Sequence, residues 1–216
     1  MTLFLTPDES VGRVLDHLET SGLAENTLVL YLGDNGFLLG EHGLIDKRNA
    51  YETSIRIPML AWSPGHIKAG AKIDALVRNI DIAPTVLELA GATTSIEMDG
   101  ASFLPLLGGE PGAQTAGREF LYEYYWEYAF PHTPTTFALR GEPFNTSNHG
   151  IWDLNELYDL QVDPQEQHNL INVPEFKGIA DEMRDRLFDR LEEADAMQLP
   201  IRRGRWQAAE RLNHSE

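Results

Sequence analysis

The sequence has 216 residues, 42% of them hydrophobic, which is enough to bury a core and to form one or two domains. Seventeen basic and 34 acidic residues give a formal net charge of −17, which disfavours binding to nucleic acid and to anionic membrane surfaces. The chain contains no cysteine, which excludes disulfides, thiolate metal sites and a thiol nucleophile within it. No apolar run approaches the roughly 20 residues of a membrane-spanning helix, and no targeting signal is recognised, so the localisation stays open.

The first half of the chain predicts alternating helices and strands. Residues 6–9 (Thr-Pro-Asp-Glu) are typical of a helix start, and Gly22 is expected to end that helix in a left-handed turn. Residues 27–33, TLVLYLG, form a continuous apolar run, as in a strand of a parallel sheet covered by helices on both faces. Residues 57–62 predict another strand, and residues 81–90 predict a second helix with an aspartate cap. This pattern indicates an α/β fold.

The composition changes near residue 110, where a turn-rich segment precedes mixed aromatic and acidic residues. We therefore predict an α/β domain over 1–112, a small α+β subdomain over 113–200 and a basic tail over 201–216. The subdomain is expected to combine a small sheet with one long amphipathic helix. Its predicted strands are residues 120–126, 136–140 and 156–160; its predicted helix has apolar positions at Phe176, Ile179, Ala180, Met183, Leu187 and Leu191.

Asp34 and Asn35 directly follow the predicted strand 27–33, at its carboxyl end, where open α/β sheets bind their ligands. Both side chains offer hard oxygen atoms, which suit Ca²⁺ or Mg²⁺. We favour Ca²⁺, because it accepts a neutral amide oxygen, with Mg²⁺ as the second choice. An Asp-Asn-Gly tripeptide is also an ordinary tight turn, so the three residues alone leave both interpretations open.

Lys47 lies twelve residues beyond Asn35 and could return to the same strand end. A lone loop lysine is usually a solvated surface charge. However, Lys47, Arg48 and Arg56 together could form a local anion pocket on an acidic protein. His42, between glycines, could hydrogen-bond or titrate near neutral pH, or could simply be a loop residue.

Five segments in this order resemble the C-terminal part of a sulfatase of the alkaline-phosphatase-like superfamily. They cover about residues 8 to 175 and read ESVGRVLDHLETSGLAENTLVLYLGDNG, LGEHGLIDKRNAYETSIRIP, VRNIDIAPTVLELAG, MDGASFLPLL and ELYDLQVDPQEQHNL. The first, second and last are specific. Within the last, residues 163–166 (Asp-Pro-Gln-Glu) also have the pattern of a helix-capping box. The resemblance implies part of a parallel or mixed sheet with flanking helices, followed by a C-terminal subdomain with an antiparallel sheet and one long helix.

The resemblance also implies roles for individual residues. Asp34 and Asn35 match the family's metal-ligand pair, in which aspartate followed by asparagine goes with Ca²⁺, and Lys47 matches the lysine that contacts the sulfate. His42 matches a Gly-Glu/Asp-His-Gly variant found in one branch, and His132 resembles a substrate-side position of the C-terminal subdomain. The family is often periplasmic, secreted or lysosomal.

The family's nucleophile is a formylglycine made from Cys or Ser in a Cys/Ser-x-Pro-x-Arg motif, and this chain contains no such motif. We therefore expect part of a sulfuric ester hydrolase for a carbohydrate or small-molecule sulfate, inactive by itself. A non-catalytic remnant that self-associates through exposed sheet edges, or pairs with another chain, is the alternative. A phosphate or phosphonate monoester hydrolase of the same superfamily is a further one.

Overall fold

The computed structural model describes residues 5–93, 95–109, 119–141, 143–148, 155–194 and 196. The chain forms two compact units that are interleaved in the sequence: Met1–Asp34 with Ile57–Ala116, and Asn35–Arg56 with Gly117–Glu216. The division predicted from composition, at residues 112/113, stays a prediction. The predicted basic tail, 201–216, lies outside the described residues.

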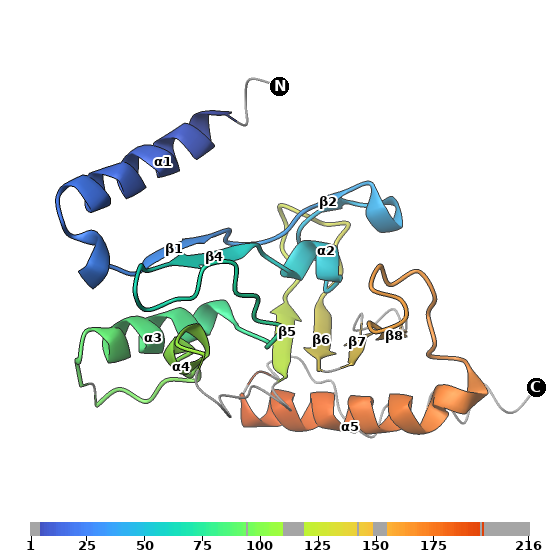
Figure 1. Cartoon of the computed structure of the whole chain (residues 1–216). Coiled ribbons are helices and arrows are strands. Elements are labelled where there is room, and N and C mark those ends of the chain that lie inside the picture. The colour runs from blue at the N-terminus through green and yellow to red at the C-terminus, as the bar shows by residue number, and fades with distance from the viewer. Residues whose placement is uncertain are drawn as a thin grey trace, which may run out of the picture. The chain divides into compact units, whose positions relative to one another are not determined.

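The first unit begins with the predicted helix, α1 (Leu5–Thr20). Its C-terminus is closed as expected: Gly22 has a φ of +72°, and the N–H of Leu23 donates to the carbonyl of Leu18 at 3.0 Å. A short 3₁₀ helix, η1 (Ala24–Asn26), leads into strand β1 (Val29–Leu32). The helix and strand predicted from the local pattern are therefore both present (Figure 1).

Strand β1 pairs with β4 (Met59–Trp62) in the antiparallel direction, with Leu30 opposite Ala61. A parallel neighbour was expected for this strand; among the described residues, its pairing is antiparallel instead. A continuous apolar run predicts that both faces are covered, but it does not fix the direction of the neighbouring strand. The side chains of Tyr31 and Leu60 are 47% and 64% exposed, so the described residues cover these strands incompletely.

The predicted aspartate at the start of the second helix has a different role from a side-chain cap. The 3₁₀ helix η3 (Asn79–Asp81) runs into α3 (Ile82–Leu89), and a further short helix is α4 (Leu104–Leu107). The fully buried Asp81 carboxylate pairs with Arg78 at 3.0 Å and accepts the N–H of Ala101 at 2.8 Å. Burial tends to raise the pKa of Asp81, but these contacts outweigh it and lower the pKa.

In the second unit, four antiparallel strands form a sheet in the order β5-β6-β7-β8. The strands are β5 (Phe120–Tyr124), β6 (Thr136–Arg140), β7 (Phe144–Asn148) and β8 (Asn155–Asp159). Three of them were predicted. Strand β7 was not predicted, because its polar sequence FNTSN lacks the apolar signal of a strand.

The long helix α5 (Lys177–Glu193) follows a 3₁₀ turn, η5 (Pro174–Phe176), and lies along the four-stranded sheet (Figure 1). Its apolar side packs on the strands, as the helical spacing predicted. The core they form consists of Phe137, Leu139, Leu157, Ala180, Met183, Leu187, Phe188, Leu191 and Ala196. This core anchors the sheet on which the candidate site depends.

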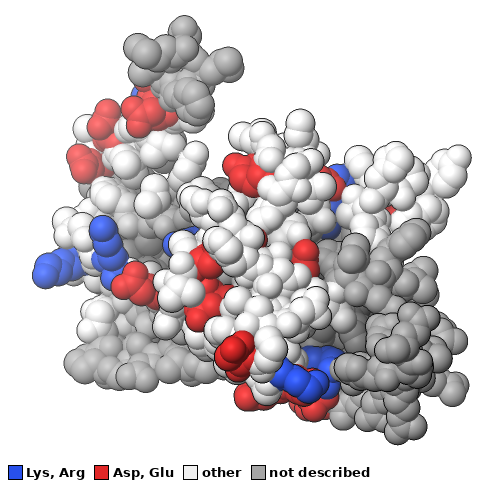
Figure 2. Space-filling model, turned by 90° about the vertical axis from the view of Figure 1, so that its right-hand side faces the viewer, with Lys and Arg blue, Asp and Glu red and all other residues white. Residues whose placement is uncertain are grey.

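Acidic and basic side chains lie next to one another on the face shown in Figure 2. On α5, Arg186 and Arg190 both pair with the carboxylate of Glu119, which precedes β5. Part of the small basic complement is thus used in ion pairs. None of the helices in the described segments has both the length and the apolarity needed to cross a membrane.

Candidate functional site

The segment 35–56 begins after β1 and the two residues that follow it, Gly33 and Asp34, and contains a small hairpin. Its strands are β2 (Leu38–Leu39) and β3 (Ile45–Asp46), joined by the 3₁₀ turn η2 (Glu41–Gly43), and the short helix α2 (Glu52–Ile55) follows. Leu38 pairs with Asp46, so the residue after Asp46 returns beside the start of the segment. The hairpin therefore explains how a lysine twelve positions away can reach Asn35.

The structure brings Lys47 and Asn35 together. The Lys47 ammonium donates to Oδ1 of Asn35 at 2.9 Å, and Nδ2 of Asn35 donates to the Gly36 carbonyl at 2.7 Å. Both ends of the amide are thereby assigned, with the oxygen facing the ammonium. Lys47 is exposed and Asn35 is half-buried, so this pair is accessible to a ligand.

Asp34 is exposed and is the last residue of the first unit, immediately before Asn35. Carboxylate and amide oxygens fit the chemistry of Ca²⁺ or Mg²⁺. Even with a bidentate aspartate, these two residues supply about three oxygens, against the 6–8 that Ca²⁺ takes. Among the described residues, no group of three or more His, Cys, Asp or Glu side chains could hold a metal ion. The residues present therefore fit only part of such a site.

Gly36 is required at the turn after Asn35 because the backbone passes very close to α2. Its N–H donates to the Ser54 carbonyl at 2.8 Å, and a Cβ at position 36 would lie 2.2 Å from the Thr53 carbonyl oxygen. No side chain fits there without a shift of the backbone. Gly36 thus keeps the start of the segment against its end.

Replacing Gly36 by alanine is expected to lower the free energy of unfolding of the second unit by about 1–3 kcal/mol, the usual cost of overpacking. Urea unfolding followed by amide exchange in 35–56 measures the loss. Gly178→Ala is the matched control: a Cβ there meets nothing within 4 Å, and alanine in the helix should stabilise by roughly 0.5–1 kcal/mol. Equal stability of the Gly36 variant and the natural chain would contradict the close approach.

His42 lies in η2 with a φ of 54°, a left-handed conformation that is uncommon outside glycine. Its imidazole stacks on the ring of Tyr51, with centroids 3.8 Å apart and planes 5° from parallel. The Tyr51 hydroxyl donates to Oε1 of Glu156 at 3.0 Å; burial and this carboxylate raise the pKa of Tyr51. His42 is exposed, so it has a structural contact and also a surface open to a ligand.

Arg48 does not belong to the anion pocket that was predicted from three neighbouring cations. Its guanidinium donates to Asp46 at 2.7 Å and to Glu127 at 3.1 Å, and it lies 3.2 Å over the ring of Phe130. These contacts neutralise it and fasten the β5–β6 connection to β3. Lys47, in contrast, contacts the predicted site residue Asn35.

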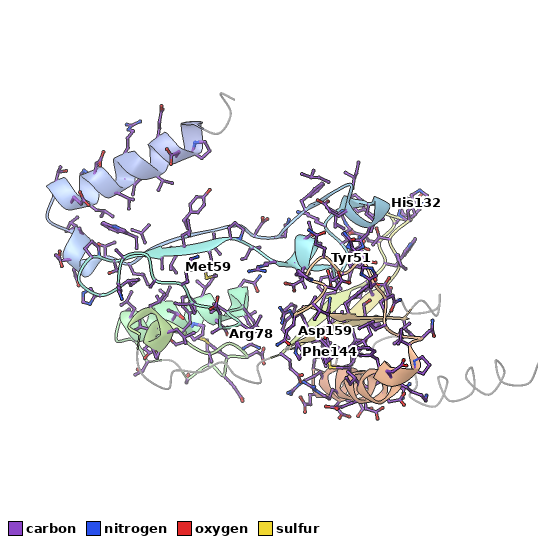
Figure 3. The ribbon with its side chains drawn as sticks, turned by 45° about the vertical axis from the view of Figure 1, so that its right-hand side comes forward. Tyr51, Met59, Arg78, His132, Phe144 and Asp159 are labelled. Atoms are coloured by element: carbon purple, nitrogen blue, oxygen red, sulfur yellow. The ribbon has the colours of Figure 1, made fainter. Side chains whose placement is uncertain are left out.

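His132 lies on the exposed connection between β5 and β6 (Figure 3). The hydroxyl of the next residue, Thr133, donates to Oδ2 of Asp46 at 3.0 Å, so the connection that carries His132 is held against β3. Burial tends to raise the pKa of Asp46, but the hydrogen bonds that its carboxylate accepts from the Lys47 N–H and from Arg48 have the larger effect and lower this pKa. The predicted substrate role of His132 stays a prediction.

The structural role of Glu166 was not predicted. The pattern of residues 163–166 predicted a helix-capping box, but no helix follows directly: Glu166 has a φ of 54° and is 2% exposed. Its carboxylate accepts the N–H of Glu52 at 2.6 Å and Nδ2 of Asn145 at 2.5 Å. Burial raises its pKa to about 7. A buried acid after a strand gives no local periodic signal, so pairing with distant residues could not be predicted.

Comparison with known proteins agrees with this arrangement. Residues 40–193 match the family described as N-sulphoglucosamine sulphohydrolase, C-terminal. An N-acetylglucosamine-6-O-sulfatase from Bacteroides thetaiotaomicron is 37% identical over 175 residues, which are 80% of this chain and 31% of that protein. The chain thus spans about a third of the length of this relative.

Solved structures show the same fold. A protein in complex with its substrate D-glucosamine-2-N,6-O-disulfate superposes with a TM-score of 0.80 at 33% identity, over 90% of this chain and 40% of that one. The phosphonate monoester hydrolase of Agrobacterium radiobacter, 22% identical, superposes with a TM-score of 0.70 over 84% of this chain and 38% of its own, which shows the fold alone. The α/β architecture with an antiparallel sheet and a long C-terminal helix is that of the alkaline-phosphatase-like proteins, and the chain belongs to the sulfatase family, as part of its C-terminal region.

Proposed function

We propose that this chain is part of a sulfuric ester hydrolase that cleaves a sulfate monoester of a carbohydrate or another small molecule. The observation that carries the proposal is the contact between the Lys47 ammonium and Asn35 Oδ1, at the base of the β2–β3 hairpin. It places a cation beside one of two oxygen-bearing residues at the end of a strand. One relative is named N-acetylglucosamine-6-O-sulfatase, and one structural neighbour was solved with D-glucosamine-2-N,6-O-disulfate as its substrate; both support a sulfated sugar as the class of substrate.

The chemistry requires this combination of groups. A sulfate monoester resists nucleophilic attack until the negative charge on its oxygens is balanced, and a fixed ammonium balances part of it. Asp34 and Asn35 would be only part of the ligands of a divalent ion such as Ca²⁺, so further oxygen ligands would be needed for an ion to balance the rest. Lys47 would orient the sulfate, while Asn35 keeps the ammonium in place. His42 and His132 are proposed to contact the substrate beyond the sulfate group.

The 216-residue chain by itself is proposed to be inactive, because it contains neither cysteine nor a Ser-x-Pro-x-Arg sequence from which formylglycine could be made. A chimera tests this. The N-terminal portion of a sulfatase relative that carries the Cys/Ser-x-Pro-x-Arg motif is joined to this chain at residue 8. Mass spectrometry verifies the formylglycine, and release of sulfate is measured for 4-nitrophenyl sulfate and for 6-O-sulfated N-acetylglucosamine.

The chimera is expected to turn over at rates within the usual range of roughly 1–10³ s⁻¹, and the chain alone to release no sulfate above buffer. A folded chimera that carries formylglycine and hydrolyses phosphate or phosphonate monoesters, but no sulfate ester, would favour the monoester hydrolases of the same fold. Hydrolysis by the chain alone would overturn the proposal about its missing nucleophile.

The exposed apolar residues of β1 and β4 favour a second candidate, a non-catalytic piece that associates with itself or with another chain. Tyr31 and Leu60 expose 47% and 64% of their surface on a two-stranded pair. Such a surface is an association hazard. Sedimentation of the purified chain distinguishes the two: concentration-dependent oligomers support this candidate, whereas a monomer with one cooperative melting transition opposes it.

A further inference from the structure

A buried carboxylate connects the segment that carries Lys47 to the C-terminal sheet. Resting on the proposed function, we propose that Glu166 is a positioning residue: it fixes residues 50–52, and through them holds Lys47 against Asn35. No hydrogen bond joins Glu166 directly to Lys47 or to Asn35 among its described contacts. Glu166 acts through the backbone of the segment.

Two atoms of the segment are held by this carboxylate and its partner. Oε2 of Glu166 accepts the N–H of Glu52, and Oε1 accepts Nδ2 of Asn145 on β7. The same amide nitrogen of Asn145 also donates to the carbonyl of Ala50 at 3.0 Å. A single Glu166–Asn145 pair therefore satisfies one backbone donor and one backbone acceptor, on either side of Tyr51.

Tyr51, between these two anchored residues, extends the link to the hairpin. Its hydroxyl is bonded to Glu156 on β8, and its ring carries the stacked His42. Figure 3 shows Tyr51 on this segment next to α2. Three consecutive residues are thus fastened to the sheet, and Lys47 stands three residues before the first of them. These attachments add to the hairpin register in holding the segment that carries the ammonium.

The backbone at Glu166 supports a dedicated role. Its φ of 54° is a conformation that costs a non-glycine residue free energy, and the carboxylate contacts offset that cost. Its surroundings are also charged: Glu52 on α2, which pairs with Arg140 at 3.0 Å on β6, and Glu156 and Tyr158 on β8. The nearby carboxylates oppose ionisation of Glu166, and the two N–H donors favour it.

Nuclear magnetic resonance of the 216-residue chain tests the proposal without any enzymatic activity. The observed signals are the backbone amide of Glu52, which reports the carboxylate directly, and the side-chain amide of Asn35, which reports its contact with Lys47. In the natural chain, both are expected to shift together as the pH passes about 7, where Glu166 gains its charge. The titration is repeated in a His42→Ala background, so that the histidine is not the titrating group.

In the Glu166→Gln variant, above pH 7, the Asn35 signal should move to the position found in Lys47→Ala, and the shared titration should disappear. Gln165→Ala, an exposed neighbour in the same turn, is the control and should keep both signals. If the Gln variant changes the Glu52 amide but leaves Asn35 in place, Glu166 holds α2 alone and the inference is wrong. If that variant does not fold, the natural chain still tests the inference. An Asn35 signal that stays fixed while the Glu52 amide titrates would equally show that the inference is wrong. An inactive chimera with the expected resonance shifts would overturn the proposed function and leave this inference intact.

Discussion

Replacing Lys47 by alanine is expected to lower kcat/KM of the chimeric sulfatase by about 100- to 1,000-fold, the usual loss when one preorganised group that stabilises transition-state charge is removed. The ammonium is exposed and is held by Asn35 at 2.9 Å, so it is oriented before the substrate binds. Steady-state kinetics with 4-nitrophenyl sulfate measure the loss. A decrease in kcat would indicate charge balance in the transition state, and an increase in KM alone would indicate binding of the sulfate in the ground state.

Lys72→Ala is the matched control, because Lys72 is an exposed lysine in the other unit and outside the proposed site. It should leave kcat/KM unchanged. If the Lys47→Ala chimera had the same rate as the unsubstituted chimera, the role of Lys47 on which the proposed function depends would be wrong. The control also separates loss of this ammonium from a general change in the charge of the acidic protein.

The sequence predicted the helix and strand that lead to the site, since their signals are local. The end of α1 was predicted from Gly22, since glycine readily adopts the left-handed turn that follows a helix. Strand β1 was predicted from its run of apolar residues. The direction of the strand beside β1 could not be predicted in this way. It depends on pairing between residues distant in sequence, and the observed partner, β4, is antiparallel.

Within the candidate site, twelve residues of separation between Asn35 and Lys47 allowed a contact but did not require it. The contact depends on the hairpin register, in which Leu38 lies opposite Asp46. That register was not predicted, because each strand of the hairpin is only two residues long. Arg48 was grouped with Lys47 because the two are adjacent in the sequence. In the structure Arg48 forms ion pairs with Asp46 and with the distant Glu127.

Buried polar residues were the hardest to predict. Asn145, Thr146 and Ser147 on β7 are buried although their side chains are polar, because neighbouring strands and the segment 35–56 supply their hydrogen-bond partners. Such partners are separated from them by up to 95 residues. A pattern of apolar residues contains no information about this kind of burial, and β7 and Glu166 were missed on these grounds.

Replacing Leu139 by alanine is expected to lower the free energy of unfolding of the second unit by about 2–5 kcal/mol, the range for a large-to-small change in a core. Leu139 is fully buried on β6, a central strand of the sheet, in the core that α5 covers. Removing its side chain loses apolar burial and leaves a cavity between strand and helix. Because two units can unfold separately, amide exchange of β6 and β7 is the measurement, rather than one global melting curve.

Leu39→Ala is the matched control, since Leu39 is the same residue type in the same unit but is 78% exposed on the hairpin. Its loss should stay within about 0.5 kcal/mol, as for most surface substitutions. Equal losses at the two leucines would mean that α5 does not cover β6 in solution. A large loss at Leu139 alone, accompanied by faster exchange at the amide of Glu52, would show that the candidate site depends on this core: the sheet that Leu139 stabilises also carries Asn145, and with it the anchor of the Lys47 segment.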